Sequence, residues 1–225
     1  MTKGIFITAT GTDVGKTYVS ALIVKKLREL GINCGYYKPA LSGAEFINGK
    51  VIPGDCDYVF NQSGIAKNPS DYVSYIFKDA VSPHLASVIE NKPIKLNKIK
   101  SDFERIKQEF DYIVVEGAGG IACPFKIDSN KIILLADVIK ALTLDVIIIA
   151  SASLGTINST LLTVEYARQK DIHVKGIILN NYDKNDLMQR DNKIQIEALT
   201  GIKVITTVEK NAEYIADLSE YFKEV

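Results

Sequence analysis

The sequence predicts an α/β fold, a parallel doubly wound sheet with helices on both faces. Short apolar runs rich in β-branched residues, typical of buried strands, alternate with longer segments whose apolar residues recur at helical spacing. With 225 residues, of which 47% are hydrophobic, the chain is long and apolar enough to form one core. It contains no repeat, low-complexity tract or linker, so we expect residues 1–225 to form a single domain.

The N-terminal half of the chain begins with a strand and a helix. Gly31 ends that first helix, and Ser82 with Pro83 begins a later one, because Ser caps helices and Pro is favoured at their first position. Residues 45–54 are predicted to be a polar loop, and residues 68–77 are too mixed to assign. The predicted strands are 4–7, 33–37 and 111–115, and the predicted helices are 18–27, 56–62, 83–91 and 97–110.

The C-terminal half alternates regularly. Its predicted helices are 134–142, 158–169, 187–199 and 212–222, and its predicted strands are 146–150, 174–179 and 203–207. Strands joined through helices in this way pair in parallel. Ligands of such sheets bind beyond the carboxyl ends of the strands, so the segments that follow strands are where function is expected.

Residues 8–17 lie between the first strand and the first helix and have the composition of a phosphate-binding loop. Gly11 and Gly15 allow a tight turn whose backbone N–H groups point at a polyphosphate. Lys16 is expected to reach the outer phosphates, and the Thr17 hydroxyl to hold Mg²⁺.

This loop matches the strict pattern G-x-x-x-x-G-K-[ST] only in part. The pattern requires Gly where this chain has Thr10, and the variant that is one residue longer requires Gly where it has Ala9. The prediction of a P-loop NTPase therefore depends on Gly-Lys-Thr together with its position between strand and helix. A plain surface turn is the alternative.

Three further loops that follow predicted strands carry polar groups suited to chemistry at the carboxyl edge of the sheet. One carries Lys38 and Ser42, with Asp55 further along, the second carries Glu116, and the third lies at residues 154–158. Glu116 follows a buried strand and is the expected acidic ligand of Mg²⁺, with helix capping as the alternative. Lys38 can neutralise charge on a transferred phosphoryl group, although a lone loop lysine is more often solvated. Asp55 and Asp57 begin a short helix, where carboxylates serve capping as often as chemistry.

The turn at residues 154–158 opens a helix, and its backbone N–H groups can bind a second anion such as a substrate carboxylate. The residues alone therefore predict a Mg²⁺-dependent ATPase, or an ATP-using transferase or ligase, that acts on a small anionic molecule.

Composition narrows the possible partners and compartment. Lys+Arg and Asp+Glu both number 27, so no net charge indicates a nucleic-acid or membrane-surface partner. Cys34, Cys56 and Cys123 are far apart and odd in number, as expected of reduced cytoplasmic thiols rather than of disulfides or a zinc site. We expect no signal peptide and no membrane-spanning segment.

Taken together, these segments resemble the dethiobiotin synthetase family, which closes the ureido ring in biotin biosynthesis. The combination of Tyr-Lys-Pro and Ser-Gly with Val-Glu-Gly-Ala-Gly-Gly is specific to it. The resembling segments keep the family's order and span nearly the whole chain: 7–17, 37–39 with 42–43, 82–84, 115–120, 154–158 and 179–181.

The resemblance implies an enzyme that uses ATP, Mg²⁺, CO₂ and 7,8-diaminononanoate. In the family, an amine captures CO₂ as a carbamate, the carbamate oxygen attacks the γ-phosphate, and the second amine closes the ring and releases phosphate. The family also implies a homodimer in which each substrate carboxylate is held by a helix N-terminus of the neighbouring subunit.

The resemblance also assigns roles to residues. Catalysis is assigned to Lys16, Lys38, Thr12 and Ser42, and Mg²⁺ binding to Thr17, Asp55 and Glu116. Asp55 is chosen over Asp57 by its spacing to the Gln-Ser-Gly at residues 62–64, and Asp57 is kept as the alternative. Nucleotide binding is assigned also to Asp13, Val14, Gly15, Tyr18, Gly117, Ala118, Gly119, Asn180, Asn181, Val208 and Glu209, with Asn180 reading the adenine. Substrate binding is assigned to Thr12, Lys38, Ser42, Gly119 and, from the second subunit, Gly155, Thr156, Ile157 and Asn158.

A ParA- or MinD-like partitioning or positioning ATPase is the alternative of a different class. Such proteins usually carry a second lysine early in the phosphate loop, where this chain has Thr10 and Gly11. Nucleotide-dependent binding to DNA or membrane would favour that alternative.

Overall fold

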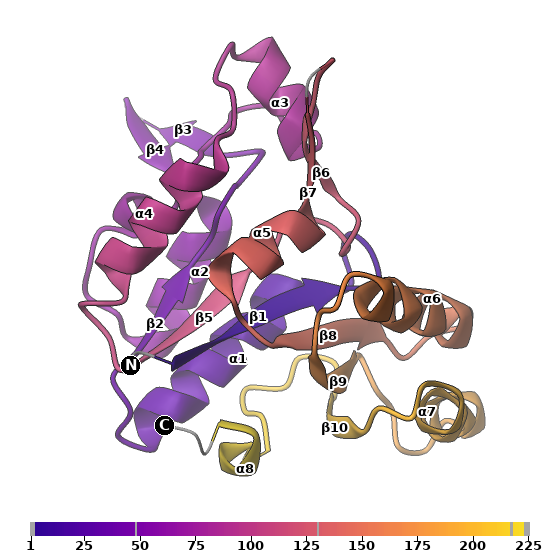
Figure 1. The fold of residues 1–225 in the computed structure, drawn as a ribbon. Helices are drawn as coiled ribbons and strands as arrows, with labels where there is room; N and C mark the ends of the chain where they lie inside the picture. Colours follow the sequence, from indigo (N-terminus) through magenta and orange to yellow (C-terminus); the bar gives the residue numbers. More distant parts are fainter. Residues whose placement is uncertain (1–2, 48, 130, 217, 223–225) are drawn as a thin grey trace.

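The structure is a computed structural model that describes residues 3–47, 49–129, 131–216 and 218–222 (Figure 1). Within these ranges the central sheet has six parallel strands in the order β10-β9-β8-β1-β5-β2. They are β1 (Lys3–Ala9), β2 (Cys34–Tyr37), β5 (Tyr112–Glu116), β8 (Val146–Ser151), β9 (Val174–Asn180) and β10 (Val204–Val208). The predicted parallel sheet is confirmed.

β1 lies in the middle of the sheet. Phe6 is opposite Val115 of β5 on one side and Val146 of β8 on the other. Every residue of β5, and all but the last of β8, is buried. Because helices cover both faces, these strands are continuous apolar runs and do not alternate with polar residues.

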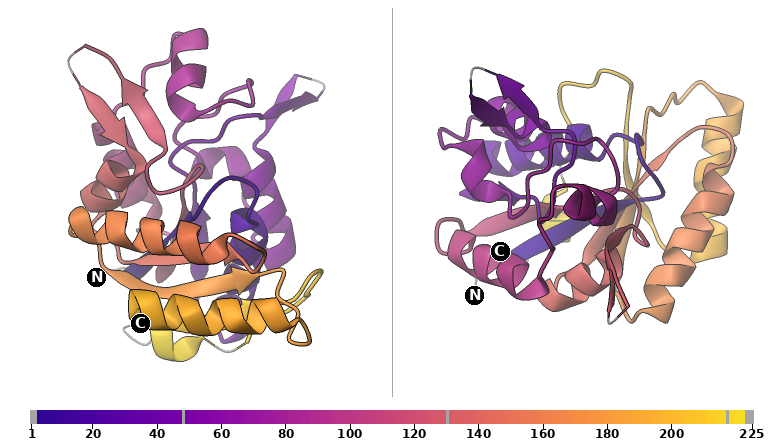
Figure 2. Two further views of the ribbon diagram at one scale, coloured as in Figure 1. Left: turned by 90° about the vertical axis from the view of Figure 1, so that its right-hand side faces the viewer. Right: turned by 90° about the horizontal axis from the view of Figure 1, so that it is seen from above.

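Helices pack on both faces of the sheet, with α4 to α7 on one face and α1 and α8 on the other (Figures 1 and 2). The connection after β1 runs toward the β2 edge, whereas the connection after β5 runs toward the opposite edge. This change of direction opens a crevice at the carboxyl ends of β1 and β5. The helices are α1 (Lys16–Glu29), α2 (Gly54–Ser63), α3 (Pro83–Ile89), α4 (Leu96–Ile106), α5 (Leu135–Leu142), α6 (Thr156–Gln169), α7 (Leu187–Thr200) and α8 (Ser219–Phe222), with a 3₁₀ turn at Pro69–Tyr72.

Two antiparallel hairpins rise above the carboxyl ends of the strands (Figure 1). One joins β3 (Glu45–Ile47) to β4 (Lys50–Ile52), within the segment predicted as a polar loop. The other joins β6 (Pro124–Ile127) to β7 (Ile132–Leu134), where no strand was predicted. The prediction of a loop at 45–54 was therefore wrong, because Glu45–Ile47 pairs with Lys50–Ile52. The sequence Asn-Gly between two such segments is a common signal for a hairpin.

The predicted closing helix at 212–222 is wrong over most of its length. The structure has a helix only at Ser219–Phe222, and Asp217 lies outside the described residues. The Tyr18 hydroxyl donates to the Ala212 carbonyl, and the Lys25 ammonium donates to the Glu213 carbonyl. In the predicted helix these two carbonyls would accept from backbone N–H groups, but here side chains of α1 bind them. Contacts with α1 thus override the helical pattern of this segment.

Other predicted elements exist with shifted ends, which are the least certain part of such predictions. The helix predicted to end at 110 ends at Ile106, and the one predicted to begin at 158 begins at Thr156. Among the described residues, no helix combines the length and apolar character needed to cross a bilayer.

Candidate functional site

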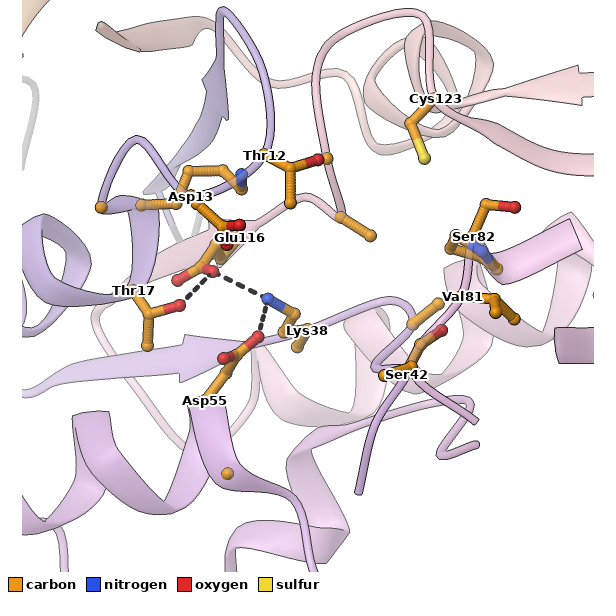
Figure 3. Close-up of a pocket in the computed structure, with 18 of the residues that line it drawn as sticks. Thr12, Asp13, Thr17, Lys38, Ser42, Asp55, Val81, Ser82, Glu116 and Cys123 are labelled. Atoms are coloured by element: carbon orange, nitrogen blue, oxygen red, sulfur yellow. Dashed lines mark hydrogen bonds and ion pairs between the residues drawn. The ribbon is translucent and has the colours of Figure 1, made fainter. Parts of the chain in front are cut away.

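A cavity of about 900 Å³ lies over the carboxyl ends of β1, β2 and β5 (Figure 3). Residues of the phosphate loop, the turn after β2, the start of α2 and the glycine-rich turn after β5 line it. The lining includes the following predicted site residues: Thr12, Asp13, Gly15, Lys16, Thr17, Tyr18, Lys38, Ser42, Asp55, Glu116, Ala118 and Gly119. Segments up to about a hundred residues apart in sequence thus meet at the edge where ligands of parallel sheets bind.

The phosphate loop is held open by unusual backbone angles. Asp13 and Gly15 both have positive φ, 59° and 90°. The Lys16 ammonium, largely buried, donates to the Gly11 carbonyl at 3.1 Å, so its side chain folds back over the loop. Burial lowers the pKa of Lys16, and the nearby Lys38 lowers it further against the opposing effect of Glu116. A loop of this shape leaves its N–H groups and its lysine available to phosphate oxygens.

Gly15 has no room for a side chain. A Cβ atom there would lie 2.1 Å from Asn180 Nδ2, which itself donates to the Val14 carbonyl at 3.0 Å. The glycine is therefore required by its positive φ and also by the close approach of the end of β9.

Glu116 is the centre of the polar cluster in the cavity. Its side chain is fully buried, and its Oε1 accepts hydrogen bonds from Thr17 Oγ1 at 2.8 Å and from Lys38 Nζ at 2.7 Å (Figure 3). Its Oε2 accepts from the Tyr36 hydroxyl at 2.9 Å. A buried carboxylate needs such partners, and here three side chains supply them.

Lys38 lies between two carboxylates. Its ammonium forms ion pairs with Glu116 and with Asp55 (Figure 3). Burial lowers the pKa of Lys38, but Glu116 and Asp55 outweigh burial and raise this pKa above its usual value. Burial raises the pKa of Asp55, and Lys38 outweighs it, so that this pKa lies below its usual value. Both groups are therefore charged at neutral pH.

The two aspartates that the sequence left open occupy different places. Asp55 contacts Lys38 and lines the cavity, whereas the carboxylate of Asp57 accepts from Asn61 one turn further along α2. The geometry therefore favours Asp55 as the residue that acts in the cavity.

Tyr36 is a site residue that the sequence prediction missed. In the parallel register of β2 and β5, Tyr36 is opposite Val114. Two residues further along both strands, Lys38 lies beside Glu116. Side chains two residues apart on a strand point to the same face, so Tyr36, Lys38 and Glu116 converge. This alternation was the signal that could have identified Tyr36.

The side-chain oxygens of Thr17, Asp55 and Glu116 are ligands suited to Mg²⁺. This ion binds one or two carboxylates and completes its coordination shell with phosphate oxygens and water. An ammonium already lies between the two carboxylates, so this point of the cavity favours a cation. In the part of the chain that the structure describes, no group of three or more His, Cys, Asp or Glu side chains could hold a metal. The residues therefore fit a magnesium ion shared with a nucleotide rather than a site built from protein ligands alone.

The opposite end of the cavity is formed by different residues. Ser42, Val81, Ser82 and Cys123 lie there, across from Lys38 (Figure 3). The Ser42 hydroxyl is buried and has no hydrogen-bond partner among the described residues, so a bound ligand could satisfy it. Val81, Ser82 and Cys123 were not predicted as site residues. Burial raises the pKa of the Cys123 thiol to about 11, although Lys16 acts in the opposite direction.

The residues predicted to contact the nucleobase do not line the cavity, and one of them, Asn180, contacts the phosphate loop at Val14. Asn180 and Val208 are paired at the ends of β9 and β10, and the Tyr182 N–H donates to the Val208 carbonyl at 2.9 Å. Asn180 is buried, and within the described residues its Oδ1 has no partner. Asn181 and Glu209 directly follow the two strands.

The four residues at the start of α6 also lie outside the cavity. Gly155 has a φ of 89° and is exposed, as is Asn158, whereas Thr156 is buried and Ile157 is half-buried. Leu154, just before them, is 85% exposed. Within one copy of the chain, this helix N-terminus does not complete the site.

Solved structures share the fold. The chain matches a ParA family ATPase from Chlorobium tepidum with a TM-score of 0.58 and 16% identity, covering 95% of this chain and 87% of that one. It matches the septum site-determining protein MinD from Pyrococcus horikoshii with a TM-score of 0.56 and 16% identity, covering 100% and 90%. At this identity the likeness shows the fold alone.

Proteins found by sequence similarity share much higher identity with this chain than those structures do. A family model described as an AAA domain matches residues 3–217. The chain is 54% identical to the ATP-dependent dethiobiotin synthetase BioD of Clostridium botulinum strain 657 (Type Ba4) over 228 residues, with 100% of both chains covered. It is 51% identical to the protein of the same name from the Loch Maree strain (Type A3), again with 100% of both chains covered. The chain therefore belongs to the dethiobiotin synthetase family of P-loop nucleotide-binding proteins.

Proposed function

We propose that this chain is an ATP-dependent dethiobiotin synthetase that converts 7,8-diaminononanoate, CO₂ and ATP into dethiobiotin, ADP and phosphate. The observation that carries the proposal is the cluster in which Lys38 bridges Asp55 and Glu116, within the same cavity as the Lys16 phosphate loop. The full-length similarity to dethiobiotin synthetases supports the same reaction.

ATP binds with its phosphates in the loop that ends at Lys16. The backbone N–H groups of residues 13–17 and the positive end of α1 favour the phosphate charge, and Lys16 leaves the Gly11 carbonyl to contact the outer phosphates. Asn180, which contacts the loop at Val14, binds the base together with Asn181, Val208 and Glu209 at the ends of β9 and β10. The Oδ1 of Asn180, which has no partner among the described residues, accepts from the adenine amino group. Gly117, Ala118 and Gly119 border the phosphates from β5.

Thr17, Asp55 and Glu116 would hold Mg²⁺ together with phosphate oxygens. The ion supplies charge neutralisation at the phosphates when it is bound. When Mg²⁺ occupies Asp55 and Glu116, these carboxylates no longer need the Lys38 ammonium as their only cation. Lys38 can then contact the phosphoryl group that is transferred. Lys16 and Lys38 together stabilise the negative charge that develops on this group.

The substrate diamine lies toward Thr12, Ser42 and Gly119. One amine attacks CO₂ and forms a carbamate. A carbamate oxygen attacks the γ-phosphorus and displaces ADP, which gives a carbamic–phosphoric anhydride. The second amine attacks the carbonyl carbon, the C–O bond to phosphate breaks, and the ureido ring closes. Ser42, whose hydroxyl lacks a partner among the described residues, is suited to bind the carbamate.

The protein acts as a homodimer in which the start of α6 serves the site of a second copy. In one chain, Gly155, Thr156, Ile157 and Asn158 lie outside the cavity, although their N–H groups form an anion-binding helix start. The exposed Leu154 beside them supports burial against a second chain. The carboxylate at the far end of the diamine is the anion that this helix start binds.

The proposal is tested by measuring ATP hydrolysis with and without each co-substrate. We expect ADP formation to require both diaminononanoate and bicarbonate, with one dethiobiotin formed per ADP. ADP formation at the same rate when either co-substrate is omitted would contradict the proposal, and stimulation by DNA or lipid vesicles instead would favour a partitioning or positioning ATPase.

A further inference from the structure

The two oxygens of the Glu116 carboxylate have different partners. Oε1 faces the cavity and accepts from Thr17 and Lys38, whereas Oε2 points away from them and accepts from the Tyr36 hydroxyl at 2.9 Å. One oxygen is thus positioned for a ligand, and the other is held by the protein.

Tyr36 is itself fixed in place. Its side chain is fully buried, and its backbone pairs with β5 opposite Val114, two residues before Glu116. A ring packed in the core on a neighbouring strand gives its hydroxyl little freedom, so the position of Glu116 Oε2 is set by the register of β2 and β5.

We propose that Tyr36 is a positioning residue for the metal site, because its hydroxyl holds Glu116 Oε2 and thereby directs Oε1 toward Thr17 and the nucleotide phosphates. The inference rests on the proposed function, which assigns Mg²⁺ to Thr17, Asp55 and Glu116. The last torsion of a glutamate side chain has a broad energy profile, so without a partner for Oε2 the carboxylate rotates more freely. Partners that orient metal ligands typically contribute about 10–100-fold to metal affinity.

The adjacent tyrosine is a matched control. Tyr37 is also fully buried, but its hydroxyl bonds to Ser74 Oγ at 2.6 Å and to the Ile99 carbonyl at 3.1 Å, on the other face of the strand. Tyr36→Phe and Tyr37→Phe therefore each remove one buried hydroxyl from the same strand and keep the ring that fills the core. Only the first removes a partner of Glu116.

The test is a titration of wild type, Tyr36→Phe and Tyr37→Phe with Mn²⁺ in the presence of ADP, followed by electron paramagnetic resonance, together with ADP binding measured in EDTA. We expect Tyr36→Phe to weaken Mn²⁺ binding about tenfold or more and to leave metal-free ADP binding within about twofold of wild type. Tyr37→Phe should leave both unchanged. The Mg²⁺ concentration for half-maximal activity should rise in parallel with the Mn²⁺ dissociation constant.

The possible failures are distinguishable. Mn²⁺ affinity of Tyr36→Phe within twofold of wild type would overturn the role of Tyr36 and leave the metal site standing, and so would equal weakening in Tyr37→Phe. If wild type itself bound no Mn²⁺ beside ADP, the proposed metal site and the role of Tyr36 would both be wrong.

Discussion

Replacing Lys38 by methionine removes the charge at the centre of the site and keeps most of the side-chain volume. Lys38 is buried, with 3% of its surface exposed. Methionine fills nearly the same space, so the change leaves no large cavity but removes the cation between Glu116 and Asp55. Two effects follow, one on stability and one on catalysis, and they can be measured separately.

The effect on stability follows from burial. Glu116 is fully buried and keeps its hydrogen bonds from Thr17 and Tyr36, whereas the Asp55 side chain is 37% exposed and can be solvated. Removing one partner of a buried ion pair costs about 3–5 kcal/mol, and the remaining hydrogen bonds and the exposure of Asp55 place the expected loss near the lower value, about 3 kcal/mol in EDTA. Added Mg²⁺ and ADP should restore part of this loss by supplying another cation.

The effect on catalysis is larger. A positive charge aimed at a transferring phosphoryl group is typically worth about 10³–10⁵ in rate. We expect the kcat of Lys38→Met for dethiobiotin formation to fall by about 10³-fold, equivalent to about 4 kcal/mol of transition-state stabilisation, while ADP still binds through the Lys16 loop.

The assay combines urea unfolding, ADP binding and dethiobiotin formation for Lys38→Met. Lys100→Met, on the exposed side of α4, is the matched control and should match wild type in all three. A kcat for Lys38→Met within tenfold of wild type, with ADP still bound, would refute the role given to this lysine.

The remaining predictions concern the glycine loop and the two aspartates. Gly15→Ala should abolish ADP binding, because its Cβ would overlap Asn180 at 2.1 Å. Gly31→Ala, at a similar φ of 85° and with no atom of the described residues within 4 Å, should lose only stability, about 1 kcal/mol by urea unfolding. Asp55→Asn should weaken Mn²⁺ binding beside ADP at least tenfold and Asp57→Asn should not; equal affinities would remove Asp55 from the metal site. Burial raises the pKa of Asp55, but Lys38 outweighs burial and lowers it. The stabilisation from this carboxylate is therefore complete above the pKa of Asp in the unfolded chain, about 4, and is lost as the pH falls below that value. Unfolding free energies measured from pH 6 to 3 should therefore fall less steeply in Asp55→Asn than in Asp57→Asn, and parallel curves would contradict the pairing.

Local sequence signals were sufficient for the sheet and for most of the site. A strand followed by Gly-Lys-Thr and a helix placed the phosphate loop, and a buried strand that ends in Glu116 placed the acidic group, because both depend on residues close in sequence. That Lys38 would meet Glu116 could be expected from the shared edge of a parallel sheet.

Contacts between segments that are far apart in the sequence could not be predicted from local signals. Asp55 reaches Lys38 only because α2 packs where it does. Spacing to residues 62–64 favoured Asp55, but both aspartates begin the same helix, where carboxylates commonly serve as caps, so their local sequence could not show that only Asp55 meets Lys38. The segment after β10 has a helical pattern, yet α1 takes up its carbonyl groups through Tyr18 and Lys25. Tyr36 was available from the two-residue alternation of β2 but requires the register of the strands to give it a partner.

The most direct test of the proposed chemistry follows one oxygen atom. If a carbamate oxygen attacks the γ-phosphorus and the C–O bond later breaks, that oxygen leaves with the phosphate. In a single turnover lasting seconds, with freshly added C¹⁸O₂, unlabelled ATP and diaminononanoate, the released phosphate should contain one heavy oxygen that came from CO₂. Phosphate without label, formed together with dethiobiotin while the remaining CO₂ is still labelled, would contradict the transfer of the phosphoryl group to a carbamate in this site.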